Sequence, residues 1–178
     1  MIWATALELE KSASTFFFMD KGVDTGDILS QIDFDICYQD DAYSVYKKVT
    51  NIALKQIEEF ISKLQSGQHI RIKQNGGSSN IWRKRNETDG LIDFRMNSGI
   101  IYNLTRTLTK PYIGAHINYN DEDFSVWKVK EIDNFQQNIE PGMVLKTNKA
   151  TFVIKSYNGA IEVLEHNFKT SPKVGEYL

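Results

Sequence analysis

The stretch Thr15–Gln31, TFFFMDKGVDTGDILSQ, places an aspartate- and glycine-rich turn between two short apolar runs. The runs Ser14–Met19 and Ile28–Phe34 have the composition of β-strands, and the glycines of the turn allow the chain to reverse between them. Asp24 lies in that turn, inside VDTGDIL. The stretch therefore predicts a strand-turn-strand unit that presents a carboxylate at the edge of a sheet.

Asp24 has two interpretations on residue chemistry alone. Aspartate next to glycine is a common turn former, because its side chain bonds the nearby backbone. A positioned carboxylate can also orient or deprotonate a catalytic partner, often a histidine. The histidines lie far downstream, at His69, His116 and His166, where a solvated or core role is expected.

Helices are predicted on both sides of this unit. Residues 2–10 have the pattern of the end of an amphipathic helix. Asp40 and Asp41 stand where an N-cap and favourable first-turn acids belong. They precede a long segment with apolar residues at helical spacing, which predicts a helix that ends at Gly67. A further helix is expected over residues 97–109.

The pattern changes from residue 115 onward, where short alternating runs are separated by turns. Such spacing predicts a small antiparallel barrel or sandwich. The expected strands are 115–119, 124–130, 143–146, 151–155 and 160–165. Residues 68–80, with the Asn75–Ser79 run, are interpreted as a flexible connector.

Composition limits the classes of function. The chain has 178 residues, 41% of them hydrophobic, and a net charge of −2, which gives no warrant for a nucleic-acid or membrane partner. It has no run of ~20 apolar residues and no signal-peptide pattern, and its single cysteine suits a reducing cytosol. We therefore expect a cytoplasmic protein, with Cys37 buried inside the apolar run IDFDICY.

The basic run Arg83-Lys84-Arg85 follows Trp82. Arginine binds phosphate through its forked donors, and an adjacent aromatic ring can stack on a base. A solvated loop with surface ion pairs is the alternative interpretation.

Three stretches together resemble the folate-dependent formyltransferases, the family that includes the methionyl-tRNA and the sugar-nucleotide N-formyltransferases. They are IWATALELEKSASTFFFMDKGVDTGDILSQ, then RKRNETDGLIDF with IIYNLTRTLTKPYIGAHINY, and last FSVWKVKEI with EPGMVL. They cover nearly the whole chain in the family's order. The second stretch is more similar to the sugar-formylating branch than to the tRNA branch.

The resemblance implies an α/β fold in which the C-terminal part of a Rossmann-like formyltransferase domain precedes a small antiparallel β-barrel (OB-like) domain. The implied divisions are 1–80 for the catalytic part, 81–114 for a linker and hinge helix, and 115–178 for the barrel.

The resemblance also assigns roles to residues. Asp24 matches the catalytic aspartate, which acts with an asparagine and a histidine while an amine attacks the formyl carbon of 10-formyltetrahydrofolate. The implied folate-side residues are Met19, Asp20, Gly22, Val23 and Asp27, and the implied substrate-side residues are Arg83, Arg85, Asn103 and Arg106. The implied acceptor is a nucleotide-linked amino sugar, with tRNA as the alternative and a homo-oligomer as an open option.

The family segment that carries the asparagine and the histidine has no match in this sequence. We therefore expect little formyl transfer from the 178-residue chain alone. A non-catalytic truncated remnant or binding module is the alternative from another class. The apolar edge Ser14–Met19 is expected to pair with another chain or to aggregate.

Overall fold

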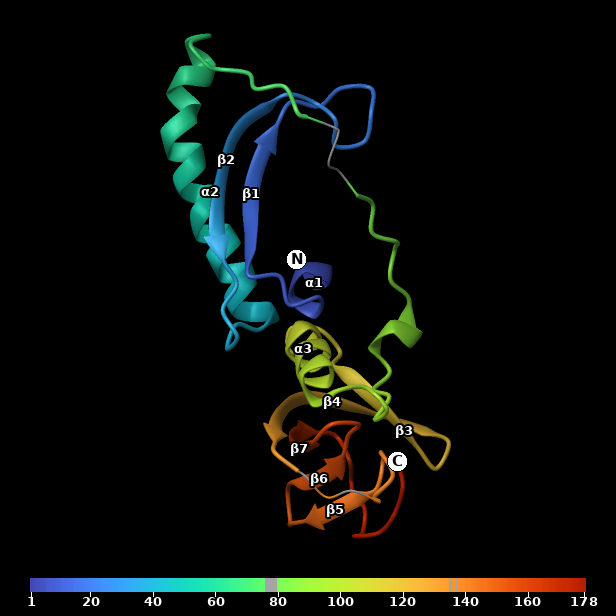
Figure 1. The fold of residues 1–178 in the computed structure, drawn as a ribbon. Coiled ribbons are helices and arrows are strands. Elements are labelled where there is room, and N and C mark those ends of the chain that lie inside the picture. Colours follow the sequence, from blue (N-terminus) through green and yellow to red (C-terminus); the bar gives the residue numbers. More distant parts are fainter. Residues whose placement is uncertain (76–79, 135, 137) are drawn as a thin grey trace.

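The computed structural model describes residues 1–75, 80–134, 136 and 138–178. Two parts lie end to end, with one helix between them (Figure 1). The elements are α1 (Ile2–Ala6), β1 (Lys11–Phe17), β2 (Ile28–Asp35), α2 (Ala42–Gln65), the 3-10 helix η2 (Glu87–Gly90), α3 (Ser98–Leu108), β3 (Ala115–Tyr119), β4 (Glu122–Ile132), β5 (Val144–Thr147), β6 (Phe152–Lys155) and β7 (Ala160–His166).

The first part is a two-stranded antiparallel sheet with α2 along one face (Figure 1). The pairing runs from Lys11 opposite Asp35 to Phe17 opposite Ile28. Gln56 of α2 is fully buried, and its amide donates to the Ser14 carbonyl at 3.2 Å. The predicted strand-turn-strand unit is confirmed. Among the described residues, no strand pairs with the other edge of β1, so the expected pairing with another chain stays a prediction.

Helix α2 has the N-cap and the terminal glycine that the sequence predicted, but its first turn contains no acidic residue. Asp41 is the N-cap, and its side chain accepts from the Ser44 N–H at 2.8 Å while the Ser44 hydroxyl accepts from the Asp41 N–H. This reciprocal capping satisfies two backbone donors that the helix leaves unpaired. Gly67 follows the helix with φ +73°, the left-handed conformation in which glycine ends helices at least cost.

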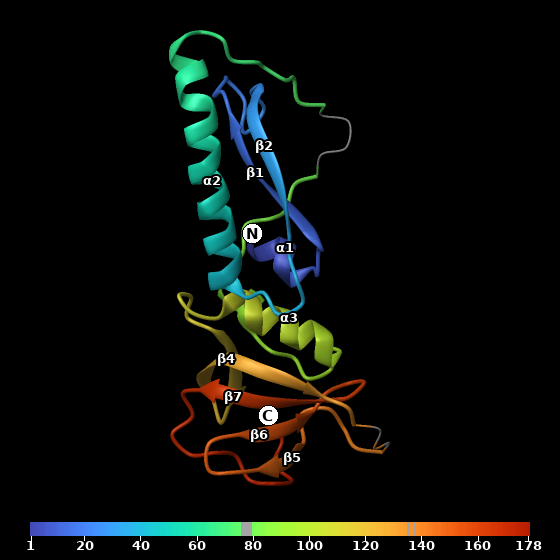
Figure 2. The same ribbon diagram turned by 90° about the vertical axis from the view of Figure 1, so that its left-hand side faces the viewer.

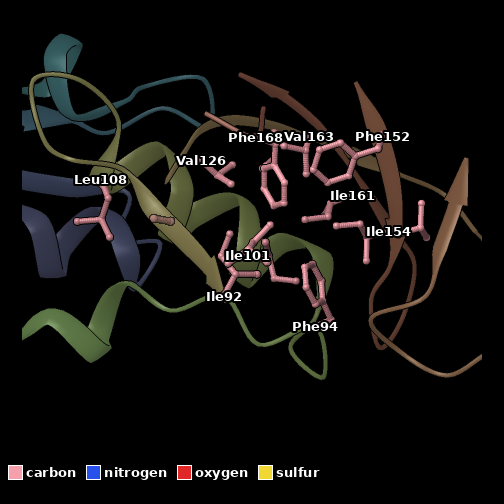
Figure 3. Packing of buried hydrophobic residues seen from close by; sticks show 14 residues of the cluster. Ile92, Phe94, Ile101, Leu108, Val126, Phe152, Ile154, Ile161, Val163 and Phe168 are labelled. Carbon is pink, nitrogen blue, oxygen red and sulfur yellow. The ribbon is translucent and has the colours of Figure 1, made fainter. Parts of the chain in front are cut away.

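The second part is a five-stranded antiparallel sheet with the order β3-β4-β7-β6-β5. Its strands pack with α3 around a continuous apolar core (Figure 3). The residues labelled in Figure 3 are Ile92, Phe94, Ile101, Leu108, Val126, Phe152, Ile154, Ile161, Val163 and Phe168. The antiparallel β domain is confirmed. Strands β3 and β5 are the two edges of the described sheet and do not pair, so closure into an OB-like barrel is not confirmed.

Helix α3 lies between the two parts (Figure 2). Its first turn is held by the β domain: the Ser98 N–H donates to Asn158 Oδ1 at 2.9 Å, and the Ser98 hydroxyl donates to Glu131 at 2.8 Å. Glu131 also accepts from the Tyr38 hydroxyl at 2.6 Å. Burial, followed by this hydrogen bond, raises the pKa of Tyr38. One carboxylate therefore joins α3, β4 and the segment that follows β2.

Three expectations need correction. Cys37 is exposed, because it lies in the turn after β2 ends at Asp35. The N-terminal helix is only Ile2–Ala6, and β1 already begins at Lys11. The connector is not free over its first half, because Ile72 pairs with β2. The Gly76–Ser79 part of the expected connector lies outside the described residues.

Among the described residues, no helix combines the length and the apolar composition needed to cross a bilayer. The division at residues 80 and 114 stays a prediction.

Candidate active site

The loop between β1 and β2 is closed by its own polar groups. The Phe18 N–H donates to the Asp27 carbonyl at 2.9 Å. Asp20 Oδ1 accepts from the Thr25 hydroxyl at 2.6 Å and from the Gly22 N–H at 2.9 Å. These hydrogen bonds, the Thr25 bond first, lower the pKa of Asp20 below its usual value. Asp20 therefore acts as an ionised anchor for the loop.

The segment after α2 holds the same loop from outside. The Gln74 side-chain amide donates to the carbonyl of Asp24 at 2.9 Å and to that of Gly26 at 2.7 Å. Ile72 and Ile28 exchange two backbone hydrogen bonds, at 2.7 and 3.0 Å. The loop backbone is thus fixed by a segment more than 40 positions away in the sequence.

Phe18 contacts two side chains of this segment, Arg71 and His69. The Arg71 guanidinium is 3.7 Å from the centre of the Phe18 ring, and its Nη1 lies 3.9 Å from Asp27 Oδ2. The His69 ring centre is 5.3 Å from that of Phe18. His69 Nδ1 is buried, and it has no hydrogen-bond partner in the part of the chain that the structure describes.

The Asp24 side chain, in contrast, is exposed. Its backbone has φ +55°, a left-handed conformation that aspartate tolerates better than most residues. No hydrogen bond or ion pair to another described residue engages its carboxylate. Met19 and Val23 are 93% and 88% exposed. The loop therefore offers a free carboxylate and two exposed apolar side chains, groups that can take a proton and contact a planar ligand.

The predicted substrate residues Arg83 and Arg85 lie on the segment before η2. Arg83 forms a two-point ion pair with Asp89, one contact being 2.7 Å, and its carbonyl accepts from the Trp3 indole N–H at 3.0 Å. Arg85 is half-buried and makes no ion pair with the described residues. Arg85 is therefore the arginine of this run that remains available to a ligand.

Asn103 and Arg106, the other predicted substrate residues, are buried in α3. Arg106 Nε donates to Asn103 Oδ1 at 2.7 Å. Its Nη1 donates to the carbonyls of Asp40 at 2.6 Å and Cys37 at 3.1 Å. Most of the polar atoms of this pair are thus used inside the protein, and their role toward a substrate stays a prediction.

The structure separates the two predicted groups. The folate-side residues share one loop with Asp24. The four substrate-side residues lie toward the other end of the hairpin, where Trp3 contacts Arg83 and Cys37 contacts Arg106 (Figure 1). Eight residues of β-strand span roughly 25 Å.

The pair of Arg83 with Asp89 predicts a pH effect on stability. The hydrogen bonds from Arg83 and from the Asn86 N–H lower the pKa of Asp89 from 3.8 to about 2. Because the folded pKa is below the unfolded one, the stabilisation is complete above about pH 4 and is lost as the pH falls toward 2.

We expect Asp89→Asn to be less stable than the unmodified protein above pH 4 and the two to converge near pH 2. Urea midpoints measured over this range check the prediction, with Asp133→Asn, an exposed position after β4, as the control. If the urea midpoints of Asp89→Asn and the unmodified protein differed by the same amount at every pH, the prediction would be wrong.

Gln74, Arg71 and Ile72 are site residues that the sequence interpretation missed. The alternation of Ile70 and Ile72 was a possible signal of a short strand, but the glycines that follow favoured a connector.

Among the described residues, no group of three or more acidic, histidine or cysteine side chains could hold a metal ion.

The family description "Formyl transferase, C-terminal domain" matches residues 84–175. The chain belongs to the formyltransferase family. The match runs from the basic run through α3 and the β domain nearly to the C-terminus. The resemblance inferred from the sequence motifs is thereby confirmed.

Curated relatives extend this formyltransferase similarity to the Asp24 loop. The methionyl-tRNA formyltransferase of Caldanaerobacter subterraneus subsp. tengcongensis is 32% identical over 99% of this chain and 57% of its own length. The bifunctional polymyxin resistance protein ArnA of Wigglesworthia glossinidia brevipalpis is 30% identical over 86% of this chain and 23% of its own. The chain thus spans a little over half the length of the first of these relatives.

Solved formyltransferase structures share the fold. The N-formyltransferase of Helicobacter canadensis, in complex with folinic acid and dTDP-3-aminofucose, superposes with a TM-score of 0.71 at 23% identity. The superposition covers 93% of this chain and 59% of that one.

Proposed function

We propose that this chain contributes to formyl transfer from 10-formyltetrahydrofolate to an amine, with Asp24 as the catalytic carboxylate. The free Asp24 carboxylate on a clamped loop, in a member of the formyltransferase family, carries the proposal. Folinic acid in the Helicobacter canadensis enzyme supports a folate as the formyl donor.

The loop residues suit a folate. Met19 and Val23 expose apolar surface on the same loop as Asp24, and the flat ring system of a folate could pack against it. The bound folate supplies the formyl group and takes back a proton. Asp24 orients the family's histidine and helps to remove the proton from the attacking amine.

For the acceptor we propose a nucleotide-linked amino sugar. The β domain, residues 115–178, contains seven lysines, no arginine and nine acidic residues. A net charge of −2 over this domain is unfavourable for a surface that must lie against RNA phosphates. The similarity to ArnA and the ligand of the Helicobacter canadensis enzyme agree with this choice.

Methionyl-tRNA is the second candidate, and two observations favour it. One is the 32% identity to a methionyl-tRNA formyltransferase. The other is a hollow of about 510 Å³ lined in part by Trp3, Trp82, Lys84 and Arg85, which suits a stacked base and its phosphate. The hollow lies near the far end of the hairpin from Asp24. A long acceptor such as a tRNA end could span that separation, whereas a sugar nucleotide is shorter.

Ligand binding to the isotope-labelled chain, followed residue by residue by NMR, tests both the folate donor and the choice of acceptor. Folinic acid is expected to shift the amide signals of Met19 and Val23. Unchanged signals at saturating folinic acid would contradict the folate assignment. Saturable binding of dTDP or UDP without tRNA binding supports the amino sugar. Binding of tRNA that weakens in Arg85→Ala supports the second candidate instead.

A further inference from the structure

A cavity of about 310 Å³ lies where helix α3 meets the two parts of the fold. Its walls come from the turn after β2, from α3, and from strands β4 and β7. Its lining includes Asp41, Tyr102, Arg106, Trp127, Lys128 and Glu165. The volume is at the lower end of the range for small-molecule sites. The cavity is separate from the Asp24 loop by the length of the hairpin.

Arg106 is the decisive group in this cavity. It is only 7% exposed. Its hydrogen bonds go to neutral oxygens alone, those of Asn103, Asp40 and Cys37. It forms no ion pair with any carboxylate of the described residues, and its Nη2 makes no hydrogen bond to them. A buried guanidinium without a counter-charge is costly, so an anion placed on it binds favourably.

Arg106, Lys128 and Lys110 stand against Glu165 and Asp41, so the charges around the cavity sum to +1. Glu165 is paired with Lys110, which also lies 5.2 Å from the Trp127 ring centre. Asp41 is engaged as the N-cap of α2. Lys128 is exposed and forms no ion pair with the described residues. The cations left without a partner are therefore Arg106 and Lys128.

Two aromatic side chains supply an apolar wall. Tyr102 is stacked on Tyr38 with ring centres 4.6 Å apart, and its hydroxyl donates to the Tyr38 carbonyl at 3.1 Å. Burial, as the largest cause, raises the pKa of Tyr102, so it stays neutral. Trp127 lies against Lys110. Tyr102 is held in place before any ligand arrives, which lowers the entropy lost on binding.

We propose that this cavity is a binding site for a small organic oxyanion, whose carboxylate or phosphate contacts Arg106 and Lys128 and whose body packs against Tyr102 and Trp127. The cavity is separate from the Asp24 loop, and the proposal does not depend on formyl transfer. It assigns Arg106, which the family resemblance placed on the substrate side, to this cavity instead. Carboxylate and phosphate share the chemistry that Arg106 recognises, so the test separates them.

Binding of benzoate, phenyl phosphate, inorganic phosphate and the neutral isostere benzamide is measured by calorimetry and NMR on the full chain, up to ~10 mM. We expect saturable binding of benzoate or phenyl phosphate with shifts at Trp127, and at least tenfold weaker binding of benzamide. Whichever of the two anions binds more tightly shows whether the site prefers a carboxylate or a phosphate. Inorganic phosphate tests whether the aromatic wall contributes, and it should bind more weakly than phenyl phosphate.

Lys128→Ala should weaken the anion about fivefold. Lys130→Ala, the next cation of β4 and not part of the cavity, should leave affinity unchanged. Arg106→Gln should abolish saturable binding. If Arg106→Gln fails to fold, the anion affinities of Lys128→Ala and Lys130→Ala are compared to test the proposal. Equal affinity for benzoate and benzamide, equal effects of the two lysine variants, or no saturable binding of any probe would overturn the proposal.

Discussion

Replacement of Asp24 by asparagine is expected to lower formyl transfer about 10³-fold, because a general acid–base group of this kind contributes 10² to 10⁴. The assay uses a chimera in which these 178 residues replace the matched 57% of the Caldanaerobacter enzyme. Asparagine keeps the size and the left-handed backbone of Asp24 and removes only the charge. The folate affinity should therefore change little while the rate falls.

Asp33→Asn is the matched control for this variant. Asp33 lies exposed on β2 of the same hairpin and undergoes the same change of charge. We expect it to retain the rate of the parent chimera. A loss of less than tenfold in Asp24→Asn, with an active parent, would remove Asp24 from the catalytic role.

Replacement of Gly26 by alanine is expected to destabilise the hairpin loop by about 3 kcal/mol. A Cβ at this position would lie 1.6 Å from the Phe18 carbonyl oxygen. This neighbour is backbone, so it cannot turn aside as a flexible side chain would. The loop must open, and the hydrogen bond from Gln74 to the Gly26 carbonyl should be lost with it.

Gly67→Ala separates steric overlap from backbone strain. Gly67 has φ +73° and open space around its Cα, so alanine there should cost only about 1 kcal/mol. Urea unfolding gives both free energies, and hydrogen exchange at the loop amides shows whether the loop opens. If Gly26→Ala proved no worse than Gly67→Ala, the close approach of the loop to Phe18 would be wrong.

Local patterns predicted most of the fold. The capping acid at Asp41, the terminal Gly67 and the alternating runs after residue 115 act over a few positions, so sequence spacing alone identifies them. Cys37 was placed wrongly because an apolar run indicates burial only while the strand continues, and β2 ends at Asp35. Where a strand ends is decided by packing.

The candidate site was predictable only in part. The Asp24 loop carries a local motif, and its residues lie together as expected. The clamp by Gln74 and Ile72 depends on contacts across more than 40 positions, which a single sequence does not reveal. The same limit explains Arg106, whose backbone partners lie 66 and 69 positions earlier.

The capping of α3 has a consequence for how the chain is made. The N–H of Ser98 finds its acceptor on Asn158, and the Ser98 hydroxyl bonds Glu131. Both partners are synthesised after the helix itself, and the Asn158 cap forms only when the turn between β6 and β7 folds. We therefore expect the first turn of α3, a helix that both α1 and α2 contact, to be completed only after residue 158 has left the ribosome.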